Sequence, residues 1–113
     1  MKNPKFLIYK GHSIPDSVAW TRTEASIFDV SHMLQTRLIG PSAIQALESV
    51  CTADVANMRD NTGALALFTN EHGGIYDDLI ANRIGQEELY IVSNASMEEQ
   101  DWDILSGYVR VLF

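Results

Sequence analysis

Three short apolar runs separated by turn-forming residues constrain the fold of this 113-residue chain more than any other feature. The runs cover residues 63–69, 75–83 and 88–93. Asn-Glu-His-Gly-Gly separates the first run from the second, and Gly-Gln-Glu separates the second from the third. Gaps this short permit hairpins but leave no room for the crossover that parallel strands require. The pattern therefore predicts an antiparallel meander.

A further strand and a helix are expected before the meander. Apolar and β-branched residues alternate loosely with polar ones over 27–39, a pattern typical of a strand, which would end at Gly40. Ser42 and Gln45 then have the spacing of a capping box and predict a helix over about 43–51. No period of two or 3.6 residues is sustained before this region, so we expect an irregular lead-in.

A second helix is expected after the meander. Asn94 or Ser96 can cap it, with Glu99 completing a capping box from Ser96. Its apolar face would carry Met97, Trp102 and Leu105. Together these elements predict an α+β fold, a mostly antiparallel sheet with packed helices.

Composition excludes several classes of protein. Eight basic and fifteen acidic side chains give a formal charge of −7, which disfavours binding to a nucleic-acid backbone. No apolar run approaches the roughly 20 residues that span a bilayer, so we expect no membrane segment. The single cysteine, Cys51, cannot form an internal disulfide.

Two adjacent carboxylates, Asp77 and Asp78, interrupt the second apolar run. Side chains alternate across a strand, so the two would point to opposite faces of the sheet. A buried carboxylate needs compensating partners and often has a catalytic or hydrogen-bonding reason. The alternative is a solvated pair near a turn, which is a common use of Asp.

A second polar cluster, Asp29, Ser31 and His32, suggests a hydrolytic triad only superficially. Neighbours on one strand point to opposite faces, whereas a triad requires convergent geometry. The three histidines also lack metal-ligand spacing with cysteine or carboxylates, so no metal site is predicted. The residues alone thus predict an α+β chain with an unusual acidic strand.

Four short motifs resemble the T-protein family, the aminomethyltransferases of the glycine cleavage system. They are Ile-Phe-Asp-Val-Ser-His-Met at 27–33, Leu-Phe-Thr-Asn-Glu at 67–71, Gly-Gly-Ile-Tyr-Asp-Asp-Leu at 73–79 and Tyr-Ile-Val-Ser-Asn-Ala at 90–95. The resemblance implies that residues 26–105 form part of the family's folate-binding domain. Residues 1–25 and 106–113 would then be divergent ends.

The resemblance also implies an activity. Family members take the aminomethyl group from the lipoyl arm of the H-protein, release ammonia, and pass the one-carbon unit to tetrahydrofolate. Asp78 matches the family's key aspartate, which makes it the expected catalytic residue. The same matching places Met33, Leu65, Ile80 and Asn94 in the folate pocket. The implied compartment is the mitochondrion for a eukaryotic source and the cytoplasm otherwise.

Other functions are compatible with the same residues. One is a folate-binding module of a dimethylglycine or sarcosine dehydrogenase, or of an iron-sulfur assembly factor. Another is a non-catalytic interaction domain, which an exposed Asp78 without a facing pocket would favour. The apolar end of the chain suggests truncation, and family members are three to four times longer. We therefore expect the chain by itself to be inactive and to bind folate weakly or not at all.

Overall fold

The computed structural model describes residues 13–107, which divide into two compact units at Val30/Ser31. The first unit contains one helix, α1 (Ile14–Thr23). Its N-terminus is a capping box, because the Ser13 hydroxyl accepts from the Asp16 backbone and the Asp16 carboxylate accepts from the Ser13 backbone. The expectation of irregular structure over residues 1–25 is wrong for this helix. No residue of α1 is buried. A helix that packs on no core needs no apolar stripe, and without one its sequence does not reveal it.

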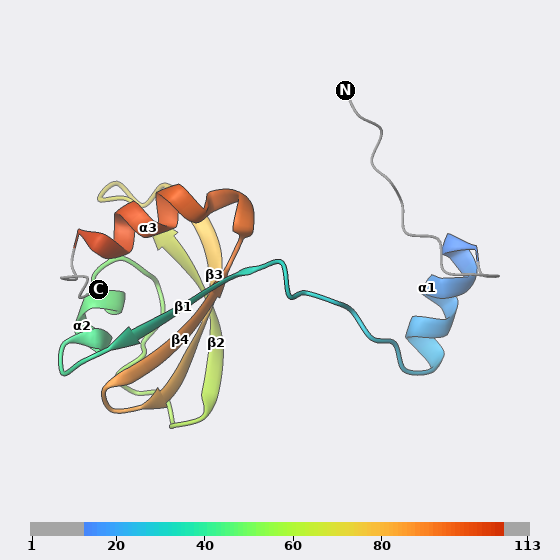
Figure 1. The fold of residues 1–113 in the computed structure, drawn as a ribbon, viewed down its shortest axis with the longest axis horizontal. Coiled ribbons are helices and arrows are strands. Elements are labelled where there is room, and N and C mark those ends of the chain that lie inside the picture. Colours follow the sequence, from blue (N-terminus) through green and yellow to red (C-terminus); the bar gives the residue numbers. More distant parts are fainter. Residues whose placement is uncertain (1–12, 108–113) are drawn as a thin grey trace. The chain divides into compact units, whose positions relative to one another are not determined.

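The second unit is built on a four-stranded antiparallel sheet (Figure 1). In sequence order its described elements are β1 (Leu34–Ile39), α2 (Ala43–Glu48), β2 (Thr62–Thr69), β3 (Ile75–Gly85), β4 (Glu88–Ser93), a 3-10 turn η1 (Ala95–Met97) and α3 (Glu98–Ser106). The strands lie in the order β1-β4-β3-β2, and every neighbouring pair is antiparallel. The predicted α+β class and the predicted meander are confirmed.

The first strand is shorter than its sequence pattern predicts. Residues 27–33 are not part of it, and Ile27 and Phe28 are exposed. The reason is the length of the partner strand: Leu34 pairs with Ser93, the last residue of β4. Residues before Leu34 therefore have no ladder to join.

The two expected helix caps are wrong. Ser42 precedes α2 but makes no cap hydrogen bond, because its backbone (φ −101°, ψ 6°) lacks the extended conformation that a capping serine needs. Asn94 precedes η1 without capping it, and its side chain bonds to β3 instead. The predicted apolar face of α3 is only partly right, because Leu105 is buried whereas Trp102 is about half exposed.

One face of the sheet is covered by α2, α3 and the segment between α2 and β2, and this is where the core lies. Alternate positions of every strand point into it, as period-two packing requires. The helices and the connecting segment contribute Leu47, Val55 and Leu105. The strand residues of this core are Leu38, Ala66, Phe68, Leu79, Ala81, Leu89 and Ile91.

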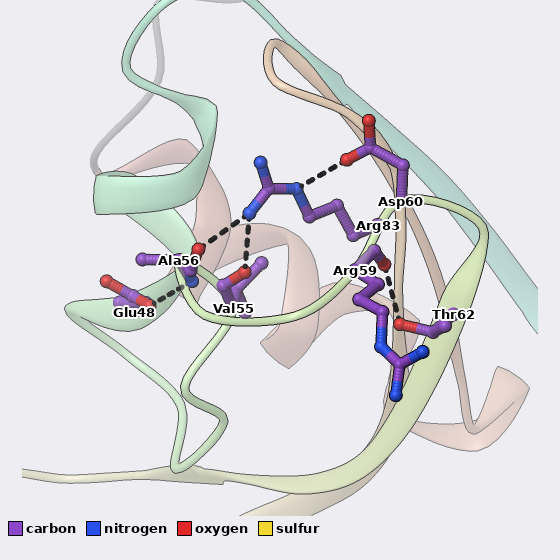
Figure 2. Close-up of polar contacts among 7 residues, drawn as sticks. All are labelled: Glu48, Val55, Ala56, Arg59, Asp60, Thr62 and Arg83. Atoms are coloured by element: carbon purple, nitrogen blue, oxygen red, sulfur yellow. Dashed lines mark hydrogen bonds and ion pairs between the residues drawn. The ribbon is translucent and has the colours of Figure 1, made fainter.

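A partly buried arginine, Arg83, holds the segment between α2 and β2 (Figure 2). Arg83 of β3 donates from Nη1 to the carbonyls of Val55 (3.2 Å) and Ala56 (2.7 Å). Its Nε also pairs with Asp60 at 2.9 Å. The Glu48 carboxylate accepts from the Ala56 backbone at 2.7 Å and ties the same segment to α2. The segment is irregular, yet the carbonyls of Val55 and Ala56 and the amide of Ala56 have partners, as partly buried backbone requires.

Candidate functional site

Asp77 and Asp78 point to opposite faces of β3, as their sequence positions predict. Asp77 lies on the covered face and is 8% exposed, whereas Asp78 lies on the open face and is exposed. A register shift between β2 and β3 falls at Phe68/Thr69, next to the position where Phe68 pairs with Asp77. Irregular pairing of this kind bends the strand locally and is common beside functional sites.

Asn94 joins the two carboxylates. Its side-chain nitrogen donates to Asp77 Oδ1 at 2.8 Å and to Asp78 Oδ1 at 3.0 Å. Its backbone nitrogen donates to Asp77 Oδ2 at 3.2 Å. Both oxygens of Asp77 are thus bound by one residue, and one oxygen of Asp78 is held in place. Hydrogen bonds to ionised acceptors are the stronger kind, so Asn94 restrains the direction of the Asp78 carboxylate.

An apolar row borders Asp78 on the open face. Leu65 of β2 pairs with Ile80 of β3, which in turn pairs with Val92 of β4, so the three side chains share one face. Leu65 is 74% exposed and Ile80 is 44% exposed. Exposed apolar side chains in a continuous row favour contact with a flat apolar surface.

The structure therefore gathers four of the five predicted site residues on or beside the open face: Asp78, Leu65, Ile80 and Asn94. Met33 directly precedes β1 and is half-buried. Its neighbour Leu34 pairs with Ser93, next to Asn94, so Met33 lies at the same end of the sheet. These positions agree with the predicted grouping but do not enclose Asp78 in a pocket.

Sequence reasoning missed a buried acid behind this site. Asp101 of α3 is fully buried, and the Ser93 hydroxyl donates to its Oδ2 at 2.5 Å. The pKa of Asp101 is raised to about 6, chiefly by burial and also by nearby Asp77, against a lowering by the Ser93 bond. A signal was available: Met97, Asp101 and Leu105 are four residues apart, which puts Asp101 in the helix's core-facing stripe.

The other polar candidates do not converge. Ser31 and His32 lie exposed in a turn before β1, without the arrangement of a hydrolytic triad. Cys51 packs half-buried against the core, and burial raises the pKa of its thiol, which makes it a poor nucleophile. Residues 13–107 contain no group of three metal-ligating side chains, and none of their helices is long and apolar enough to cross a membrane.

Comparison with known families decides where this arrangement belongs. A family model described as the GCVT N-terminal domain matches residues 8–111. The chain belongs to this family. Membership accounts for the four motifs.

Individual family members give the same result. The mitochondrial aminomethyltransferase of Homo sapiens is 43% identical over 116 residues, which cover 96% of this chain and 29% of the human protein. That of Saccharomyces cerevisiae is 41% identical, covering 84% of this chain and 24% of the yeast protein. The crystal structure of the glycine cleavage system aminomethyltransferase T from Bartonella henselae matches with a TM-score of 0.67 and 31% identity. It covers 72% of this chain and 22% of the bacterial chain.

This chain of the GCVT family therefore spans less than a third of the length of these relatives. In the relatives, most of the polypeptide lies outside the matched part.

Proposed function

We propose that the open face of this sheet is part of the tetrahydrofolate site of an aminomethyltransferase of the glycine cleavage system. One observation carries the proposal. The Asp78 carboxylate stands exposed on this face, held by Asn94, beside the apolar row that contains Leu65 and Ile80. Family membership and the names of the relatives agree with this assignment.

The proposed reaction moves a one-carbon unit to tetrahydrofolate. The aminomethyl group arrives on the lipoyl arm of the H-protein, ammonia leaves, and 5,10-methylenetetrahydrofolate forms. A fixed carboxylate at Asp78 would orient the folate and stabilise the cationic iminium that develops as ammonia departs. Apolar side chains such as Leu65 and Ile80 would pack against the flat pterin ring, and Asp78 would fix the orientation of the ring.

The remaining assignments follow from the same proposal. Met33 would border the folate beside β1, and Asn94 would contribute a polar contact while it holds Asp78. The lipoylated H-protein is the proposed partner. The relatives in human and yeast are named as mitochondrial, and we propose that compartment for this chain if its source is eukaryotic.

Titration with tetrahydrofolate tests this function. We would record amide spectra of the isotope-labelled chain while the ligand rises to millimolar concentration. Because the chain spans under a third of the relatives, we expect a dissociation constant of about 1 mM, equivalent to about −4 kcal/mol. Resonances of Leu65 and Ile80 should move. Asp78→Asn should weaken binding about tenfold, since about 1.4 kcal/mol is a typical loss for a charged hydrogen-bond partner.

Asp103→Asn is the matched control. It makes the same chemical change at an exposed carboxylate of α3, on the helix that packs against the covered face. Affinity should be unchanged in this variant. The proposal would be wrong if resonances moved mainly on α2 and α3, or if Asp78→Asn bound as well as the unmodified chain.

A non-catalytic interaction domain is the second candidate, and the exposure of Asp78 is the observation that favours it. Its open apolar face would then contact a protein rather than a pterin. The titration separates the two, because an interaction domain would show no dependence of tetrahydrofolate binding on the Asp78 carboxylate.

A further inference from the structure

The two buried carboxyl groups behind Asp78 lack a positive partner. Asp101 is fully buried and Asp77 is 8% exposed. None of the ion pairs among residues 13–107 involves either group; these pairs are Arg37–Glu88, Glu71–His72 and Asp60–Arg83. Burying an ionised carboxylate without a counter-charge is costly, so two adjacent ones cannot both stay ionised at modest cost.

The hydrogen bonds of the two carboxyl groups differ. Asp77 accepts two bonds from Asn94, one from the backbone nitrogen to Oδ2 at 3.2 Å and one from the side-chain nitrogen to Oδ1 at 2.8 Å. Donors of this kind stabilise a carboxylate. Asp101 accepts one bond, from Ser93, and its Oδ1 has no partner among the described residues. A carboxyl with an unpartnered buried oxygen gains most from holding a proton.

We propose that Asp77 and Asp101 form a carboxyl pair that holds one proton, mainly on Asp101, and that the pair orients Asn94 so that it positions the Asp78 carboxylate. Asp101 lies on α3 and Asp77 lies on β3. Asn94 bonds to Asp77 and to Asp78, and so connects the pair to the open face. The existence of the carboxyl pair does not depend on the proposed function. The importance of Asp78 does rest on the proposed function.

The orientation of Asn94 follows from the charge on Asp77. An amide side chain can present either its nitrogen or its oxygen to a neighbour. A negative Asp77 accepts from the nitrogen and repels the oxygen, so the same nitrogen is also directed to Asp78. Loss of the shared proton would place a second negative charge behind Asp77, and we expect it to disturb this connection.

Carboxyl-carbon NMR of the 113-residue chain, labelled at the aspartate side chains, tests the pair. We expect one resonance, that of Asp101, to titrate with a midpoint near pH 6, where burial places its pKa. The side-chain amide of Asn94 should shift in the same step, because it is bonded to Asp77, the neighbour of Asp101. The charged group facing Asp101 is Asp77; the other acids of α3, namely Glu98, Glu99 and Asp103, are exposed.

Three variants separate positioning from general damage. Asp101→Asn is neutral and keeps a donor for Asp77, so the Asn94 and Asp78 resonances should show no step near pH 6. Asp101→Leu removes the donor, and those resonances should move even at low pH. Asp103→Asn, the exposed control on α3, should leave the midpoint near 6 unchanged.

Several results would overturn the pair. The pair would be refuted if every aspartate titrated below pH 5, or if the Asn94 amide resonance did not move near pH 6. It would also be refuted if the spectrum lacked the dispersion of a folded protein. No folate is present in this titration. A chain that shows the coupled step but binds tetrahydrofolate equally well with Asp78→Asn would therefore refute the proposed function and leave the pair intact.

Discussion

Replacing Arg83 by Met should destabilise the chain far more than removing its ionic partner. Methionine keeps most of the aliphatic stem but deletes the guanidinium that binds two carbonyls and one carboxylate. The Arg83 side chain is 13% exposed and Asp60 is 52% exposed, so the ion pair between them is well solvated on one side. A pair of that kind contributes at most about 1 kcal/mol.

The carbonyl bonds account for the larger part of the expected loss. A bond from a charged donor contributes about 1.5–3 kcal/mol at most, less where water can replace it. Ala56 is exposed and its carbonyl can be rehydrated, whereas Val55 is fully buried. We therefore expect Arg83→Met to lower the unfolding free energy by about 2–4 kcal/mol, and Asp60→Asn to lower it by under about 1 kcal/mol.

Urea unfolding followed by circular dichroism measures both values. Arg83→Lys should fall between them, because one ammonium group can bind a carbonyl but cannot reproduce the planar fork of guanidinium. An Arg83→Met loss below about 0.5 kcal/mol would refute the reasoning, since the carbonyl bonds would then contribute nothing. Equal losses in Arg83→Met and Asp60→Asn would refute it as well, by assigning the whole effect to the ion pair.

Two further predictions concern the sheet and the buried acid. Leu79→Ala should cost about 2–5 kcal/mol in the same assay, because Leu79 is 1% exposed in the core, whereas Ile80→Ala on the open face should cost much less. For Asp101, a pKa raised to about 6 from 3.8 means that the folded chain binds this proton more tightly than the unfolded one. Its contribution to the free energy of unfolding is therefore fully present below pH 3.8 and is lost as pH rises through about 6. The difference in unfolding free energy between the unmodified chain and Asp101→Asn should change over that pH window.

Local sequence was sufficient where the structure depends on neighbours along the chain. The three strands of the meander lie within two residues of their predicted bounds, because hairpin gaps and period-two alternation are both local signals. The opposite directions of Asp77 and Asp78 followed from the same alternation. The helix α1 was missed despite its local capping box, because its exposed sequence lacks an apolar stripe.

Pairing and burial were decided by the tertiary structure. Residues 27–33 have a strand-like sequence, but β4 ends at the partner of Leu34, so no neighbouring strand is available to them. Ser96 and Glu99 have capping-box spacing, yet η1 intervenes and α3 begins at Glu98 without a side-chain cap. Sequence spacing offers a possible partner, and only the fold determines whether that partner is present.

By itself, the sequence determined the sheet, its turns, and which of two adjacent aspartates faces each side. Resemblance to the T-protein family singled out Asp78, and the structure then put Leu65 and Ile80 beside it. Only the tertiary structure brought Asp101 from α3 to Ser93 and Asn94 to both carboxylates. The physical reason is that alternation acts between neighbours in the chain, whereas the burial of a charge depends on groups that meet only after the helix packs on the sheet.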